Sequence, residues 1–414
     1  MNPYDATRIG AVILMLGAAP AGAADLFSVT VETGGVTDSA SSNDIRDLVD
    51  FIENGNYQEI NAAYTDTSIA DSLYNFRGVP ATVRYPTAGS TLIFEIPSIG
   101  ISETFSEATR ALSEEALIDF LETNQNGILT ALFQELVKTS PVDPVAGNPN
   151  SLMSKMVAAD FNSATTVGPG NSFKASGGTA DGEGDAPNLI GLQARFGRFA
   201  AGDFNSNVVD LPFSYVVPLA DPRYAVTFDA PLTFVSTEGA QSYAGSLGVG
   251  VRLPILDNWF VPPALRFGGT GSVEVGGASM LYSGSVTSNY EFNLAGIDFS
   301  LGNGVTGLQT VPISFNGYEA DYDLTNFVFR NGLGASGDTG FTLFSEPVTW
   351  EAAVVNTQFI GDALFVENAT DISVSFGTEA SENGLTWDSL RVGLTYTITN
   401  ADYSGLRLNF GYQF

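Results

Sequence analysis

From about residue 187 onward, apolar and polar residues alternate along the chain. Alternation with a period of two is typical of a β-strand with one apolar and one polar face. Segments of this kind, such as "RYAVTFDAPLTF", "YAGSLGVGVRL" and "LRVGLTYTI", are separated by Gly, Asn, Asp and Ser clusters. The pattern predicts an all-β fold of about 10–14 antiparallel strands, which is too many for one open sheet that neither curls nor closes.

Residues 24–140 carry a different pattern, which predicts a small α+β domain or plug. "SNDIRDLVDFIENGN" has a helical apolar face and a stop at Asn54-Gly55. "TLIFEIPSIGI" is a short strand interrupted by Pro97, and "EEALIDFLETNQNGILTALFQELVKT" predicts two helices on either side of Asn126-Gly127. We expect these two helices to pack on their own domain, with the following neighbours: Ile45, Leu48, Val49, Ile93 and Phe94. Residues 141–186, with their Pro/Asn-rich and Gly/Asp-rich stretches, are predicted to be a flexible linker.

The first 23 residues have the pattern of a secretory signal peptide. Arg8 precedes the apolar run "IGAVILMLGAAPAGA", which ends in small residues around Ala21. This order of basic, apolar and small residues is that of an export signal, and the run is short for a membrane-spanning helix. We therefore expect export, followed by a mature chain whose barrel covers 187–414.

Charged residues occupy the polar phase of the predicted strands. In a sandwich in water this phase would face solvent, whereas in a membrane barrel it would face the lumen. Two features favour the barrel: the apolar phase is rich in aromatic residues, as a lipid interface requires, and the eight basic residues after 187 are all Arg. The candidates for the lumen or a constriction are Arg195, Arg223, Asp229, Arg252, Arg266, Glu274, Glu291, Glu351, Arg391 and Arg407.

Composition excludes several classes of function. The chain has 16 basic and 46 acidic residues and a net charge of −30, which is unsuited to nucleic-acid binding. It contains no His, so a Ser-His-Asp triad and His zinc sites are impossible. "DGEGD" begins like a calcium loop but fails at Ala186 and Leu192, and "DFNSN" is a similar partial match. We expect no catalytic residues, no metal site and no cofactor.

The end of the sequence carries the most specific signal. Apolar residues stand at every second position up to the last one, and they are Leu406, Leu408, Phe410, Tyr412 and Phe414. This segment resembles the C-terminal strand of Gram-negative outer-membrane β-barrel proteins. The resemblance implies a location in the outer membrane, contact with its lipid, and recognition by the barrel-assembly machinery. It does not extend to residues 25–186.

Two types of barrel are similar in outline. A twelve-strand barrel preceded by a helix is similar to the translocator of autotransporters, and a fourteen-strand barrel with a hatch would resemble the fatty-acid transporters. The first functional hypothesis is an outer-membrane pore or small-solute transporter. The alternative is an autotransporter-like surface anchor that displays the N-terminal region for adhesion or envelope structure. The location of residues 25–140, inside or below the barrel or outside it, separates the two; permeant and oligomeric state stay open.

Overall fold

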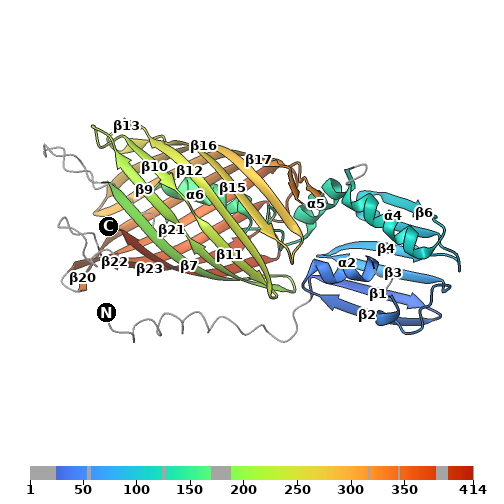
Figure 1. The fold of residues 1–414 in the computed structure, drawn as a ribbon. Coiled ribbons are helices and arrows are strands. Elements are labelled where there is room, and N and C mark those ends of the chain that lie inside the picture. The colour runs from blue at the N-terminus through green and yellow to red at the C-terminus, as the bar shows by residue number, and fades with distance from the viewer. Residues whose placement is uncertain are drawn as a thin grey trace, which may run out of the picture.

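A computed structural model describes residues 25–53, 57–123, 127–168, 188–315, 318–343, 346–378 and 390–413. The chain forms two parts, an N-terminal domain of sheet and helices and a closed β-barrel (Figure 1). The signal peptide expected over residues 1–23, the Asn54-Gly55 stop and Phe414 lie outside the described residues.

The N-terminal domain is built on a six-stranded antiparallel sheet with strand order β2-β1-β3-β4-β5-β6. Its strands are β1 (Phe27–Thr33), β2 (Val36–Ser42), β3 (Ala70–Phe76), β4 (Val79–Tyr85), β5 (Leu92–Ile96) and β6 (Ile101–Phe105). Its helices are α2 (Ile45–Glu53), α3 (Tyr57–Ile60), the 3-10 turn η2 (Pro97–Ile99), α4 (Arg110–Glu122) and α5 (Ile128–Thr139). The strand ending before Pro97 and the helix pair around Gly127 follow the sequence prediction, and Gly127 has a φ of 70°.

One face of this sheet and the helices share a hydrophobic core. Period-two positions such as Val29, Tyr74 and Val83 are buried, and they lie in the same cluster as Leu117 of α4 and Leu132 of α5. Leu48 and Phe94 belong to this cluster and Ile45 packs against it, as expected. Ile93 does not follow the expectation, because it alternates onto the other face of β5.

The second part is a closed antiparallel barrel of twelve strands among the described residues. Its elements are β7 (Leu189–Ala201), β8 (Phe204–Leu211), β9 (Phe213–Pro218), β10 (Ala225–Asp229), β11 (Leu232–Thr237), β12 (Ala240–Arg252), β13 (Pro254–Leu256), β14 (Trp259–Phe260), β15 (Pro263–Ser272), β16 (Gly277–Leu294), β17 (Ile297–Val311), β20 (Thr325–Leu343), β21 (Glu346–Gly361), β22 (Asn368–Thr378), β23 (Leu390–Thr399) and β24 (Tyr403–Gln413). A small hairpin, β18 (Ile313–Phe315) and β19 (Tyr318–Ala320), lies between β17 and β20.

The barrel closes where its first and last strands meet. β24 pairs with β7 from Tyr403↔Ala201 to Gln413↔Gly191. Several elements are two pieces of one strand, because a proline interrupts them: Pro212 separates β8 from β9, and Pro231 separates β10 from β11. Proline has no N–H to give to the ladder, so the strand bends at these points.

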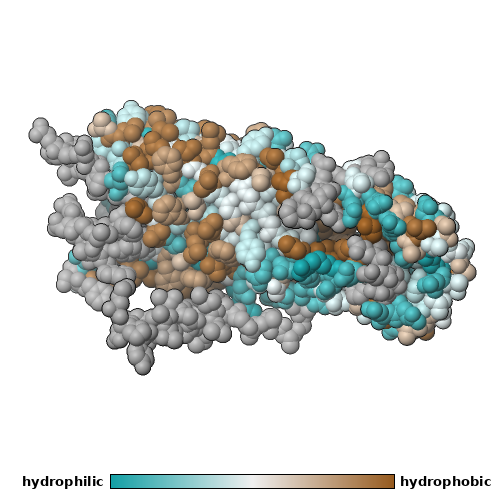
Figure 2. All heavy atoms as spheres, in the orientation of Figure 1, coloured by the Kyte–Doolittle hydropathy of each residue, from teal (hydrophilic) through white to brown (hydrophobic). Residues whose placement is uncertain are grey.

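Apolar side chains cover the outside of the barrel. The residues predicted for the apolar phase of β23 are exposed by 38–50%, and they are Leu390, Val392, Leu394, Tyr396 and Ile398. The alternate positions of β23, such as Arg391 and Thr397, are buried toward the inside. Figure 2 shows apolar surface on the half of the barrel away from the N-terminal domain and a more polar surface beside the domain. The predicted alternation, apolar outward and polar inward, is confirmed for this strand.

Residues 141–186 do not form the predicted flexible linker where the structure describes them. Positions 140–153 are buried apart from one half-buried residue. Helix α6 (Leu152–Ala164) follows and lies inside the barrel, surrounded by β10, β12, β15, β16, β17 and β20 (Figure 1). Residues 169–187, with the "DGEGD" motif, lie outside the described part of the chain. The segment is thus largely an internal element rather than a spacer.

The two ends of the barrel differ. At one end, Phe204 and Ala240, which begin β8 and β12, and Val275 in the β15–β16 turn pack into the core of the N-terminal domain. We call this end the domain rim and the opposite end the far rim. β7 begins and β24 ends at the far rim, where Gly191 pairs with Gln413; their other ends, at Ala201 and Tyr403, lie toward the domain rim. The chain therefore passes from the domain rim to the far rim by way of α6 (Figure 1). Within the described ranges, no helix has the length and apolar character needed to cross a membrane.

Candidate functional site: the helix-filled lumen

Helix α6 is held in the lumen by apolar packing. Leu152, Met153, Met156 and Val157 form a cluster with inward residues of the wall, among them Leu281. Such a cluster inside a barrel is unexpected from the sequence, because the inner phase of the strands is mostly polar. It forms because the helix brings its own apolar residues into the lumen.

Glycines in the wall make room for the end of α6 and the residues after it. A Cβ on Gly302 of β17 would lie 2.7 Å from the Phe161 ring, and a Cβ on Gly332 of β20 would lie 2.8 Å from the Val167 side chain. Both distances are shorter than ordinary carbon–carbon contacts. The wall is therefore shaped for this segment, and a larger residue at either glycine would push it away.

Ion pairs fix α6 to two sides of the barrel. Asp160 accepts a hydrogen bond of 2.7 Å from Nε of Arg266 on β15, and Arg266 also pairs with Asp229 on β10. The side chains of Arg266 and Asp160 are 0% and 1% exposed. On the other side, Lys155 Nζ lies 2.7 Å from Asp210 Oδ2 of β8. Buried pairs of this kind define position, because moving the helix would leave charges without partners.

Most of the predicted lumen residues face inward. Arg391 on β23 pairs with Glu351 on β21 at 3.4 Å, and its Nη2 donates to Thr349. Glu291 accepts a hydrogen bond of 3.0 Å from Thr166, just after α6. The remaining members of the set that line the interior beside the helix segment are Arg195, Asp229, Arg252, Arg266 and Arg407.

Two predicted lumen residues are in fact at the rims. Arg223 lies in the β9–β10 turn at the far rim, where it is half-exposed and paired with Asp221 and Asp257. Glu274 lies in the β15–β16 turn at the domain rim. Both predictions were wrong because the strand alternation was extended into turns, where side chains no longer alternate between two faces.

Sequence reasoning missed several inward charges. Lys155 and Asp160 lie on α6, and Asp210, Arg330 and Asp371 lie on β8, β20 and β22. The strand residues carry the same signal as the predicted set, a charge in the polar phase, and a complete pass over every strand would have found them. The helix residues carry no such signal, because their segment resembles a linker.

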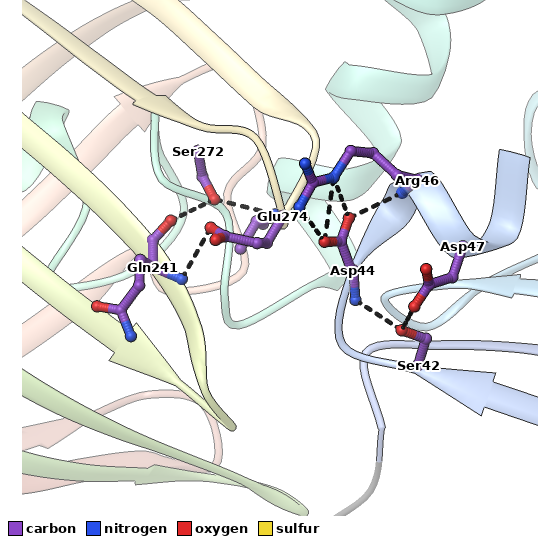
Figure 3. A network of polar contacts seen from close by, with 8 residues as sticks. Ser42, Asp44, Arg46, Asp47, Gln241, Ser272 and Glu274 are labelled. Atoms are coloured by element: carbon purple, nitrogen blue, oxygen red, sulfur yellow. Dashed lines mark hydrogen bonds and ion pairs between the residues drawn. The ribbon is translucent and has the colours of Figure 1, made fainter.

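The domain rim joins the two parts through polar contacts (Figure 3). The Ile45 N–H donates to the Glu274 carbonyl at 2.8 Å, and Glu274 Oε2 accepts from the Gln241 N–H at 3.2 Å. On the domain side, Arg46 pairs with Asp44 next to Glu274 (Figure 3). These contacts connect the β2–α2 junction to the β11–β12 and β15–β16 turns.

A buried ion pair lies deeper in the same junction. Arg77 Nη1 donates to Asp143 Oδ2 at 3.0 Å, and both side chains are at most 1% exposed. The Tyr322 hydroxyl, from the chain after β19, donates to the same Asp143 oxygen at 3.3 Å. Tyr322 also stacks on Phe133 of α5. Asp143 thereby connects the domain, the segment before α6 and the barrel.

Comparisons with known proteins give a likeness in fold only. No family model and no curated protein matches the sequence. Among solved structures, the chain is similar to the beta domain of the Bordetella autotransporter Brka, at 11% identity and a TM-score of 0.41 over 54% of this chain and 98% of that one. It is similar to the translocator domain of the autotransporter NalP from Neisseria meningitidis, at 12% identity and a TM-score of 0.40 over 64% of this chain and 96% of that one. It is also similar to the KdgM porin in complex with disordered oligogalacturonate, at 9% identity and a TM-score of 0.32 over 54% and 99%.

Scores of this size carry no argument about function, and they include both translocator and porin barrels. The class of the protein therefore rests on its own strand pairing. In the part of the chain that the structure describes, it is a twelve-stranded antiparallel barrel with a helix in its lumen and a separate domain on one rim.

Proposed function

We propose that the protein is an outer-membrane β-barrel that anchors its N-terminal domain, residues 25–140, and displays it on the cell surface. This is the surface-anchor alternative of the sequence analysis. An outer-membrane location is supported by the apolar outer face of the barrel, by the export signal expected at the N-terminus, and by the resemblance of the last strand to outer-membrane barrel proteins. Membrane lipid and the barrel-assembly machinery are the partners that this proposal includes.

The outer face carries aromatic residues at two levels along one strand. On β16, Tyr282 and Tyr290 are exposed with Val286 between them. Eight residues at about 3.4 Å each span roughly 27 Å along a strand, which a tilt of about 45° reduces to some 19 Å. This falls a little short of the apolar band of about 25 Å that is typical of membrane barrels, in which aromatic residues flank the band. Near the domain rim, by contrast, the exposed Arg198 faces outward from β7, which supports placing that rim beyond the lipid.

The position of α6 is the observation that carries the proposal. The helix crosses the lumen and is fixed there by the Asp160–Arg266 and Lys155–Asp210 pairs. A lumen filled in this way serves to hold the chain that leads to the domain, and it leaves little space for a permeant. The proposal includes no catalytic step.

The orientation follows from the route of the chain. Strand hairpins that insert from the periplasm cross the membrane in pairs. With an even number of strands, the beginning of the first strand and the end of the last strand therefore both stay on the periplasmic side. These ends are the start of β7 and the end of β24, and both lie at the far rim. The domain rim is then on the outside of the cell, and the N-terminal domain with it.

A pore or small-solute transporter is the second candidate. It is favoured by a cavity of about 100 Å³ that lies beside α6 and is lined by charged residues such as Lys155, Arg330 and Asp371. For transport, α6 would have to move, whereas for display it would stay in place.

Current recordings in planar bilayers separate the two candidates. The purified protein is expected to give no steady ionic current, because α6 fills the lumen. A variant that lacks residues 25–168 is the control, since it keeps every barrel strand that the structure describes and a current from it demonstrates insertion. A steady current of similar size from the whole protein would overturn the anchor proposal and favour the pore.

A further inference from the structure

The cavity beside α6 is lined by four cations and three carboxylates. It lies between the helix and the wall formed by β7, β8, β20, β22 and β24. Its basic residues are Lys155, Arg195, Arg330 and Arg407. Lys155 pairs with Asp210, and Arg330 pairs with Asp371 at 3.2 Å. The two guanidinium groups of Arg195 and Arg407 have no carboxylate within ion-pair distance among the described residues.

Arg407 is held in place by an aromatic ring instead of an acid. Its guanidinium carbon lies 5.1 Å from the centre of the Phe199 ring, and a cation over a ring face is a favourable contact. A Cβ on Gly197 would lie 3.0 Å from Arg407 Cγ and 2.8 Å from the ring, and a Cβ on Gly405 would overlap the ring. Two glycines therefore leave space for this stacked pair. The arrangement orients the guanidinium and uses none of its hydrogen-bond donors.

Donors in this wall lack protein acceptors. The Nε groups of Arg195, Arg330 and Arg407 are buried, and none has a hydrogen-bond partner in the described part of the protein. Arg195 donates from Nη2 to Gln193, which is neutral. These Nε atoms are closed off from the open space of the cavity, but an anion there can accept charge-assisted hydrogen bonds from the Nη groups of Arg195 and Arg407, which offsets part of the cost of burying these charges.

We propose that this cavity is a binding site for a small oxyanion of the phosphate class, held by Arg407 and Arg195 and flanked by Lys155 and Arg330. A guanidinium offers two parallel N–H donors that match two oxygens of such an anion. A cavity of about 100 Å³ suits a free ion and not an oligosaccharide or a lipid with its chains. The site is independent of surface display, since it would exist in either orientation of the barrel.

Binding of inorganic phosphate to the whole purified protein in detergent tests the proposal. Phosphate is titrated at constant ionic strength, with chloride as the other anion, and binding is followed by phosphorus NMR and by the unfolding temperature. The Arg407→Gln protein is expected to bind phosphate roughly tenfold or more weakly, because a charge-assisted hydrogen-bonding group is lost. The matched control is Arg223→Gln, which removes the same charge from an exposed turn and should leave the affinity unchanged.

A second variant and a second ligand test the same assignment. The Arg407→Lys protein retains the charge without the planar pair of donors, and it should bind with intermediate affinity; it also serves if Arg407→Gln fails to fold. Glycerol phosphate represents a lipid headgroup and should bind more weakly than the free ion. Three results would each overturn the assignment of a site for a free oxyanion. They are a protein that phosphate stabilises no more than chloride does, an Arg407→Gln protein that binds phosphate as tightly as the unchanged protein, and tighter binding of glycerol phosphate than of phosphate.

Discussion

Replacing Arg266 with methionine should release helix α6 from the barrel wall. Arg266 is completely buried between Asp160 on the helix and Asp229 on β10, which are 1% and 9% exposed, and it also donates to Ser246. Methionine fills a similar volume but leaves two buried carboxylates without a counter-ion. Breaking a buried pair by removing one partner costs about 3–5 kcal/mol.

This cost falls on the state in which the helix is docked. Opening of α6 from the wall should therefore become more frequent by roughly two to four orders of magnitude, which is the factor that 3–5 kcal/mol represents. Hydrogen exchange of the backbone amides of residues 152–164, measured in the whole protein, reports this opening directly. Arg223→Met is the matched control, because its pairs with Asp221 and Asp257 are exposed and contribute about 0–1 kcal/mol.

A rescue experiment separates charge from packing. Combining Arg266→Met with Asp160→Asn and Asp229→Asn removes all three charges, so that no buried charge is left without a counter-ion, which is the main cost of breaking the group. The triple variant should recover most of the exchange protection. The reasoning is refuted if Arg266→Met exchanges like the unchanged protein, or if the triple variant is as unprotected as Arg266→Met alone.

Three further predictions concern the rim, the N-terminal domain and the membrane face. Arg77→Met removes the partner of buried Asp143 and should destabilise the junction by about 3–5 kcal/mol, which accelerates hydrogen exchange over residues 140–151. Arg84→Met is the control, because it breaks a half-exposed pair and should cost at most about 1 kcal/mol. Burial raises the pKa of Glu114, whose carboxylate accepts from the Tyr85 hydroxyl at 2.6 Å. Because the pKa is higher in the folded state, the free energy of unfolding is highest below the unfolded-state pKa of Glu114 and falls as the pH rises through its folded-state pKa. Glu114→Gln should therefore raise the unfolding temperature at pH 7 and change it little at pH 4, measured by near-ultraviolet circular dichroism. Leu247→Arg places a charge at an outward position that is 71% exposed and should cost about 2–4 kcal/mol in urea unfolding from lipid vesicles; an unchanged midpoint there would mean that this face does not meet lipid.

The sequence predicts the barrel well because each wall residue has two simple environments. An apolar outer side and a polar lumen impose a period of two, and Leu394 outward with Arg391 inward follows directly from it. The rule ends where the backbone turns, which is why Arg223 and Glu274 were placed incorrectly. The number of strands can be predicted only roughly from the sequence, because prolines such as Pro212 break a continuous strand into two segments.

Helix α6 was hidden for a different physical reason. A helix at a surface shows one apolar stripe, whereas α6 is surrounded by the barrel and buries apolar Met156 and charged Asp160 alike. Its partners are glycines, serines and arginines of distant strands, such as Gly302 and Arg266. Its flanking Pro and Asn residues have the composition of a linker, yet Asn148 and Asn150 are buried and hydrogen-bonded in the tight turn before the helix. Only the closed barrel makes this segment an interior element.

The side of the membrane on which the N-terminal domain lies is the central claim, and labelling of single cysteines measures it directly. The chain contains no Cys, so each variant carries one reactive thiol. Ser102→Cys places it at an exposed position of β6, and Asp257→Cys places it in the far-rim turn, where the side chain is 93% exposed. With a membrane-impermeant maleimide on intact cells, the account predicts labelling of the Ser102→Cys protein at once, and labelling of the Asp257→Cys protein only after the outer membrane is permeabilised. The reverse pattern would contradict the account, because it would place the domain in the periplasm.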